Sequence, residues 1–236
     1  MTWVHIVRPH EIFSTMAIII LSYYMWKMYV SLRPNAGMAL EGMSDALNKK
    51  SPYYADHSKR VALIANAICD SMNIIGTERN IIIRSAKLHD LGKLFVDEET
   101  LHKKEKLTDR EWEIMKLHPV RGGGMAKKFG ISEPVIANIL YHHENVDGTG
   151  YPLSLKGESI PLGAKIIRVA DTIDAMAMPR PYRKARSFEE IEKDLKEHIG
   201  TWYDKTIVEK ATNGLSKRIK LIILNNTFIG TEASTL

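Results

Sequence analysis

The sequence predicts an all-α protein. Strand signals, in which apolar and polar residues alternate, are sparse along the chain. Apolar residues instead recur at the spacing of one helix face, as they do after His57 at Val61 and Ile64. A Ser or Thr followed by Glu three positions later, which marks the start of a helix, occurs near residues 108 and 187. The chain is therefore expected to form a bundle of helices.

Residues 1–36 form an apolar N-terminal segment, and residues 37–236 are predicted to form one domain. Between residues 12 and 30, Lys27 is the only formally charged residue, and aromatic residues gather toward the end near Tyr29. A helix of about 20 apolar residues spans a bilayer. Aromatic and basic residues at one interface would leave the rest of the protein in the cytoplasm, tethered to the inner membrane. The alternative is a helix packed on the domain, and the sequence leaves both open.

Local signals divide the next part of the chain into helices. Ser51-Pro52 is expected to open the helix that carries His57. Gly76-Thr77 is expected to separate this helix from the next, which ends at His89-Asp90 with Gly92 as its stop. Both helices therefore place a histidine near one of their ends.

The remaining elements follow from caps and from Gly and Pro. Thr108 and Glu111 form a predicted capping box for the helix that leads to His118, and Pro119 begins a new segment. The next predicted helix starts at Ser132-Pro134 and ends at His142-His143, and an irregular loop follows it to Pro161. Two more helices are expected: one carries Asp171 and Asp174, and the other starts at Ser187 and stops near Gly200.

Several histidines lie on the inward faces of these helices. His89 and Asp90 are adjacent, so an imidazole and a carboxylate can bind one metal ion. A single buried histidine usually has ordinary hydrogen-bond partners. A cluster of them lacks enough donors and acceptors for mutual satisfaction unless a cation is present. The inward-facing histidines besides His89 are His57, His118, His142 and His143. The pattern therefore predicts a metal centre in the core.

Two signatures resemble those of the HD-GYP family, a branch of the HD superfamily of metal-dependent phosphohydrolases. They are His-Asp-Leu-Gly-Lys at 89–93 and His-His-Glu-Asn-Val-Asp-Gly-Thr-Gly-Tyr-Pro at 142–152. The similarity runs from about residue 40 to about residue 211. It implies a helical bundle of the HD superfamily, with a metal centre in its core, that hydrolyses the bacterial second messenger cyclic di-GMP to linear pGpG, GMP or both.

The resemblance also implies roles for individual residues. Asp90 and Lys93 would be catalytic, and Lys93 would also contact substrate together with Arg180, Arg183 and Tyr151. Glu144 is expected to orient a ligand histidine. Two divalent ions, iron or manganese, would be bound. Their ligands would be His57, His89, Asp90 and Asp171 for one ion and His118, His142 and His143 for the other, with Asp90 bridging. Tyr53 stands where members with a third metal carry glutamate, so two ions are expected.

Composition adds little to this interpretation. The protein has 236 residues, of which 44% are hydrophobic and 26% are charged, and its formal net charge of +5 favours an anionic substrate only weakly. No basic run interleaved with aromatic residues indicates nucleic-acid binding.

Diguanylate cyclase domains are a candidate partner through the Gly-Tyr-Pro loop. Two alternatives remain: a non-catalytic module that binds cyclic di-GMP or such a cyclase, and an HD phosphohydrolase for another nucleotide.

Overall fold

The computed structural model describes residues 9–49, 56–103, 105–179, 184–212 and 217–223. Within these ranges the protein is all-α, and the β-pairing consists of an isolated bridge between Ile199 and Tyr203. The predicted fold class is therefore confirmed. The elements, in chain order, are α1 (Pro9–Lys49), α2 (His57–Ser71), α3 (Gly76–Leu88), the 3-10 helix η1 (Leu91–Phe95), α4 (Glu98–His102), α5 (Asp109–Met115), α6 (His118–Lys128), α7 (Glu133–Tyr141), the 3-10 helix η2 (Gly157–Ser159), α8 (Leu162–Ala177), α9 (Phe188–Glu197) and α10 (Lys205–Thr212).

Two apolar clusters hold the helices together. In the larger cluster, α2 and α8 pack with α9 and α10 through side chains such as Ile68, Ile167 and Ile191. In the smaller one, Leu88 and Ile139 join the ends of α3 and α7 to η1 and α6. Each of these buried side chains contributes about 1.5–3 kcal/mol of hydrophobic stabilisation. The helices that carry the predicted ligands are thus fixed by packing on both sides of the site.

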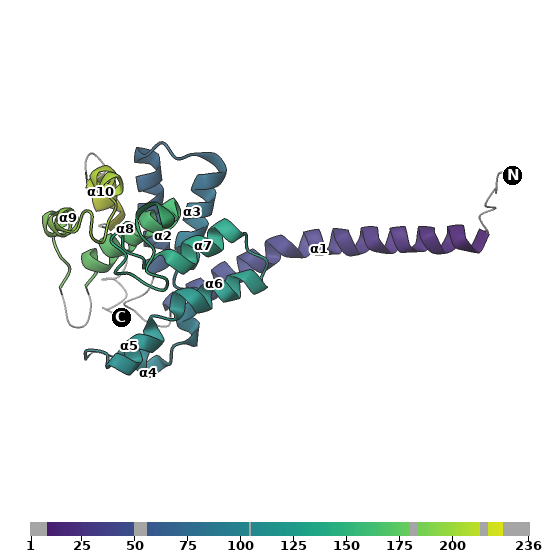
Figure 1. The fold of residues 1–236 in the computed structure, drawn as a ribbon, viewed down its shortest axis with the longest axis horizontal. Helices are drawn as coiled ribbons and strands as arrows, with labels where there is room; N and C mark the ends of the chain where they lie inside the picture. The colour runs from purple at the N-terminus through teal and green to yellow at the C-terminus, as the bar shows by residue number, and fades with distance from the viewer. Residues whose placement is uncertain (1–8, 50–55, 104, 180–183, 213–216, 224–236) are drawn as a thin grey trace, which may run out of the picture.

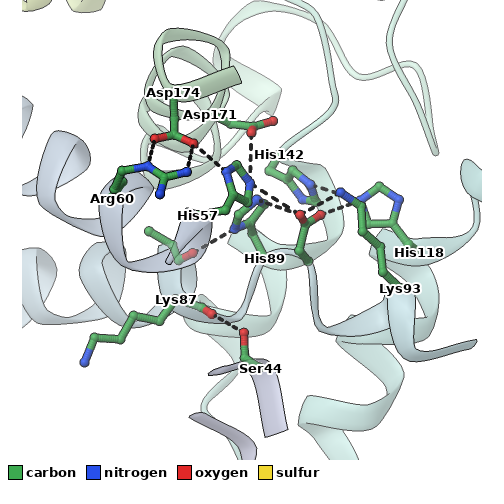
Figure 2. Close-up of polar contacts among 12 residues, drawn as sticks. Ser44, His57, Arg60, Lys87, His89, Lys93, His118, His142, Asp171 and Asp174 are labelled. Atoms are coloured by element: carbon green, nitrogen blue, oxygen red, sulfur yellow. Dashed lines mark hydrogen bonds and ion pairs between the residues drawn. The ribbon is translucent and has the colours of Figure 1, made fainter. Parts of the chain in front are cut away.

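Helix α1 packs on the domain only near its C-terminal end (Figure 1). Leu40 and Leu47 are buried there. The Ser44 hydroxyl donates a hydrogen bond of 2.8 Å to the carbonyl of Lys87 at the end of α3, as Figure 2 shows. This contact connects α1 to the helix that precedes the His-Asp pair.

The N-terminal part of α1 fits neither of the two predicted arrangements. The side chains from Met16 to Met28 are exposed, and this part of the helix extends away from the domain (Figure 1), so the packed-helix alternative is wrong for these residues. No helix in the described part of the chain is long and apolar enough to cross a membrane, so the spanning alternative is not supported. Tyr23, Tyr24 and Lys27 lower the mean hydropathy of this segment. The boundary at residues 36 and 37 stays a prediction.

Most predicted helix starts are found where local chemistry placed them. Thr108 with Glu111 and Ser187 with Glu190 both form complete capping boxes. Ser132 is the N-cap of α7, and Pro134 lies in its first turn. The predicted start at Ser51-Pro52 lies outside the described residues. Helix α10 was not predicted from the sequence.

Two glycine assignments were wrong. The break between α2 and α3 lies at residues 72–75, and Gly76 is the first residue of α3. Gly92 does not stop α3, which ends at Leu88, but lies within η1. A Cβ at Gly92 would be 1.9 Å from the His118 carbonyl oxygen. Gly92 is therefore needed for the close approach of η1 to α6, a long-range requirement that the local sequence does not reveal.

Candidate metal centre

The structure brings all seven predicted metal ligands together. His57 begins α2, His89 and Asp90 follow α3, His118 begins α6, His142 and His143 follow α7, and Asp171 lies in α8. Figure 2 shows the side chains of His57, His89, His118, His142 and Asp171 pointing toward one another from these separate elements. Six of the predicted ligands therefore lie at or next to a helix end, and Asp171 lies inside a helix.

The ligand atoms form three overlapping groups, in each of which they lie within 4.8 Å of one another. One group is His57, His89 and Asp171, and another is His118, His142 and His143. The third joins His89, Asp90 and His142 and so overlaps both of the others. The first two groups contain residues that the resemblance assigns to one ion each, and that assignment stays a prediction.

The Asp90 carboxylate lies between the two sets of ligands. Its Oδ2 is 3.4 Å from His57 Nε2 and 3.5 Å from His89 Nε2, and its Oδ1 is 3.4 Å from His118 Nε2. Each oxygen therefore faces a different set. Such an arrangement is suited to a bridging carboxylate, and the bridging role itself stays a prediction.

Three histidines are held in the tautomer whose Nε2 lone pair can bind a metal ion. The Nδ1 atoms of His89, His118 and His142 lie 2.7–2.8 Å from the backbone carbonyls of Ala86, Met115 and Ile139. Because a carbonyl only accepts, each Nδ1 must carry the proton. The Nε2 atom of each ring then presents its lone pair to the centre.

The donor set fits divalent metal ions. His89 Nε2 is fully buried and has no hydrogen-bond partner among the described residues. His118 Nε2 and His142 Nε2 lie 3.3 Å apart, and both rings already donate through Nδ1. Lone pairs that face one another in a buried site are costly unless a cation binds them. All the donors are nitrogen or oxygen, which suits iron, manganese or zinc.

The protonation states also suit metal binding. Burial lowers the pKa of His118 to about 4, and burial and neighbouring histidines hold the pKa values of His142 and His143 well below the usual range. For Asp90, burial acts to raise the pKa, but Lys93 and the surrounding histidines lower it well below the usual range. For Asp171, burial also acts to raise the pKa, but the hydrogen bond and charge of His57 lower it well below the usual range. Neutral imidazoles and ionised carboxylates are the forms that bind metals.

His57 differs from the other histidines because acids surround it. Its Nε2 lies 3.3 Å from Asp171 Oδ1, and its Nδ1 lies 2.7 Å from Asp174 Oδ2. Burial would lower the pKa of His57, but hydrogen bonds to Asp171, Asp174 and Asp90 raise it well above the usual range. A proton and a metal ion therefore compete for Nε2.

Asp174 connects His57 to a buried arginine that the sequence analysis missed. Arg60 donates to Asp174 Oδ1 through Nε at 2.6 Å and to Oδ2 through a terminal nitrogen at 3.1 Å, and Figure 2 shows the chain from Arg60 through Asp174 to His57. Both side chains are buried. One signal could have revealed this role, because Arg60 lies on the same inward face of α2 as His57 and Ile64.

Lys93 and Tyr151 lie beside the predicted ligands. Lys93 Nζ donates a 2.6 Å hydrogen bond to Asp90 Oδ2. The Tyr151 ring stacks on His143 with ring centroids 4.8 Å apart. Both residues line a cavity of about 590 Å³ that also reaches His57, His118 and Asp171. The predicted substrate contacts Arg180 and Arg183, and Tyr53, lie outside the described residues.

Glu144 has a different role from the one predicted. Its buried carboxylate accepts hydrogen bonds from the backbone amides of Leu153 and Leu155, at 2.7 and 3.0 Å. Glu144 therefore fixes the Gly-Tyr-Pro loop. Neither of these two hydrogen bonds involves a predicted ligand histidine. Gly150 serves the same loop, because a Cβ there would lie 2.3 Å from the amide nitrogen of Asn145.

The family described as HD domain matches residues 41–207. The chain belongs to the HD domain family. The expected fold of the HD superfamily is confirmed, and one solved structure of similar fold is "Bd1817, a HDG"Y"P protein from Bdellovibrio bacteriovorus". That structure is 19% identical with a TM-score of 0.58, and the match covers 80% of this chain and 64% of the other. A cyclic GMP-AMP phosphodiesterase structure from V. cholerae, V-cGAP3, has a TM-score of 0.57 at 18% identity, covering 79% of this chain and 53% of that one.

Curated relatives of this HD domain have names that include phosphodiesterase. "3'3'-cGAMP-specific phosphodiesterase 3" of Vibrio cholerae is 35% identical over 158 residues, covering 67% of this chain and 34% of the relative. "Cyclic di-GMP phosphodiesterase response regulator RpfG" of Xanthomonas campestris is 36% identical over 160 residues, covering 66% and 42%. The chain thus spans about a third to two fifths of the length of these relatives.

Proposed function

We propose that this HD domain is a metal-dependent phosphodiesterase that hydrolyses a cyclic dinucleotide. Cyclic di-GMP is the first candidate substrate, and linear pGpG, GMP or both are the products. One observation carries the proposal: nitrogen and oxygen donors of seven side chains converge beside a cavity that also contains the Lys93 ammonium group. The names of the relatives support the reaction class and the substrate class.

The proposed cofactors are two divalent ions, iron or manganese. His57, His89, Asp90 and Asp171 would hold one ion, and His118, His142 and His143 would hold the other, with Asp90 shared. Bound divalent cations neutralise phosphate charge and make water a stronger nucleophile near neutral pH. The absence of a thiolate from this donor set supports the choice of metals. The count of two rests on the division of the ligands into two sets on either side of Asp90.

The reaction requires proton transfer, and Lys93 is the residue proposed to perform it. Water attacks phosphorus and releases a proton, the bond from phosphorus to the 3′-oxygen breaks, and the leaving oxygen gains a proton. The Lys93 ammonium lines the cavity and is held 2.6 Å from Asp90. It can donate a hydrogen bond to a phosphate oxygen or protonate the leaving group. Arg180 and Arg183 are proposed to bind phosphate oxygens in pairs.

A cyclic dinucleotide with one adenine is a second candidate, because a relative at 35% identity is named for 3'3'-cGAMP. Diguanylate cyclase domains remain the proposed partner of the Gly-Tyr-Pro loop, and the cytoplasm remains the proposed location. No polymeric nucleic acid is expected as a ligand.

The test is an assay of purified protein with manganese or ferrous iron against a panel of cyclic dinucleotides. Wild-type protein should hydrolyse cyclic di-GMP, and a chelator should stop the reaction. Asp90→Ala should lower kcat/KM at least about 1,000-fold, because this carboxylate faces both ligand sets. Lys93→Ala should retain metal and lose about 100-fold or more in kcat.

Three other outcomes of this assay would contradict the proposed function or its mechanism. Full hydrolysis by Asp90→Ala or by chelated wild type would rule out the proposed mechanism. Metal-dependent hydrolysis of other nucleotides without activity on any cyclic dinucleotide would favour a different HD phosphohydrolase. Tight binding of cyclic di-GMP without turnover would favour a non-catalytic module.

A further inference from the structure

The cavity extends beyond the metal centre to a rim formed by side chains from residues 100–103 and 105–115, here called the distal rim. The distal rim contains α5, which has no buried residue and lies at the edge of the protein beside α6 (Figure 1). Its conformation is fixed locally by the Thr108 capping box and by Lys103, whose Nζ lies 2.7 Å from both carboxylate oxygens of Glu111. Core packing therefore does not explain the side chains that the distal rim presents to the cavity.

Trp112 is the largest of these side chains. It lines the cavity and is 46% exposed. Its ring lies edge-on to Tyr151, with centroids 6.3 Å apart, and Tyr151 in turn stacks on His143. A row of aromatic rings thus leads from a predicted metal ligand to the distal rim. Exposed aromatic faces of this kind accept nucleobases, because every base has a π face.

The distal rim also provides a cation that is not committed to an acid. Of the lysines that line the cavity, Lys93 bonds to Asp90 and Lys103 bonds to Glu111. Lys106 is exposed and forms no ion pair within the part of the chain that the structure describes. Glu105, which is also exposed, is the acid beside it. An anion in this part of the cavity would therefore be attracted by Lys106 and repelled by Glu105.

We propose that the distal rim binds the half of the substrate that is remote from the reacting phosphate, with Trp112 stacking on a purine base and Lys106 pairing with the second phosphate. This inference rests on the proposed function, because a cyclic dinucleotide has two phosphates and two bases. When one phosphate lies at the metal centre, the other must be held elsewhere in the cavity. The cavity of about 590 Å³ is within the range of about 300–1,000 Å³ for ligand pockets.

Kinetics on two substrates test the role of Trp112. Trp112→Ala should raise KM for cyclic di-GMP at least about fivefold with little change in kcat, because stacking acts equally on the ground and transition states. Trp112→Phe keeps a π face and should restore most of the lost affinity. Hydrolysis of bis-para-nitrophenyl phosphate, which has no purine and no second phosphate, should change less than twofold in both variants.

Paired charge changes test Lys106. Lys106→Ala should raise KM for cyclic di-GMP about two- to fivefold, and Glu105→Gln should lower it by a similar factor. Lys127→Ala is the control, since Lys127 is exposed on α6, pairs with Glu133 and does not line the cavity. It removes the same charge and should leave KM unchanged.

The outcomes separate this inference from the proposed function. If wild type hydrolyses cyclic dinucleotides but Trp112→Ala and Lys106→Ala keep the wild-type KM, the assignment of the distal rim is overturned and the function stands. If wild type cleaves only the small diester, the proposed function fails. Parallel loss of both activities in Trp112→Ala would also overturn the assignment, since it would show that Trp112 supports the metal centre.

Discussion

At the scale of single residues, buried carboxylates and carbonyls decide what each imidazole can bind. His57 is oriented by Asp174, and Asp174 is in turn held by Arg60. A carboxylate behind a ligand histidine raises the basicity of the ligating nitrogen and fixes the ring orientation. Asp174 is therefore expected to position His57 in the predicted metal centre.

Asp174→Asn should weaken metal binding about 10- to 100-fold, because the substituted amide no longer carries the charge that supports His57. It should also lower the free energy of unfolding by about 3–5 kcal/mol, since Arg60 would lose its buried counter-ion. Metal titration and denaturant unfolding measure the two effects. The matched control is Asp70→Asn, which removes the carboxylate that pairs with Arg79 and Arg218 at the surface and should cost about 1 kcal/mol or less. Equal effects of the two substitutions would contradict the assigned role.

The stability of chelated protein should depend on pH. His118, with a pKa of about 4, and His142 and His143, whose pKa values are also lowered, stay neutral in the folded state at pH values where the unfolded chain is protonated. The unfolded state then binds more protons, so stability falls as pH falls from about 6.5 toward about 4. The raised pKa of His57 has the opposite effect, but only above about pH 6.5, where the unfolded chain loses the proton that folded His57 keeps.

Thermal unfolding in the presence of a chelator measures this dependence. The Tm at pH 5 should be lower than at pH 7, and His118→Gln should make the difference smaller. A Tm that is higher at pH 5 than at pH 7 would contradict the lowered pKa values of these three histidines. The acids Asp90 and Asp171 contribute above their unfolded pKa of about 3.9, and their contribution is lost only at lower pH.

At the scale of elements, the approach of η1 to α6 sets the distance between Asp90 and His118. Gly92→Ala places a Cβ 1.9 Å from the His118 carbonyl oxygen, so the two elements must separate. The variant should lose about 1–3 kcal/mol of stability, together with metal affinity. Gly42→Ala is the control, because nothing lies within 4 Å of its Cβ in α1, and it should be neutral or stabilising by up to about 1 kcal/mol. Chemical denaturation of both variants checks the contrast.

Sequence predicted the elements whose signals are local. The capping boxes at Thr108 and Ser187 involve residues three positions apart, so their geometry could be inferred directly. The convergence of the seven predicted ligands could be inferred because inward-facing imidazoles are rare and their motifs are specific. Gly92 and Arg60 were not interpreted correctly, because their partners, His118 and Asp174, are distant in sequence. The contact between Trp112 and Tyr151 also depends on packing between distant segments.

At the scale of the whole molecule, α1 consists of a projecting part and a packed part (Figure 1). A protein that begins at Pro34 should keep the Tm and the metal content of the full chain, because the side chains from Met16 to Met28 are exposed. Removal of residues 1–49 should cost about 3–6 kcal/mol, since Leu40 and Leu47 lose their burial. Thermal unfolding followed by circular dichroism measures the Tm of each truncated protein, and elemental analysis measures its metal content. An equal Tm for the two truncated proteins would contradict the role assigned to the end of α1.

The hydrogen bonds of His89, His118 and His142 to backbone carbonyls have a further consequence. Each acceptor belongs to the last turn of a helix, where carbonyls lack partners within the helix. Each ring therefore completes the end of a helix, and its rotamer is fixed as that helix forms. The side-chain entropy of these rings is lost during folding rather than during ion capture. Metal loading of the folded protein should then have a small ordering cost, so depletion and reloading can proceed without unfolding of the surrounding helices.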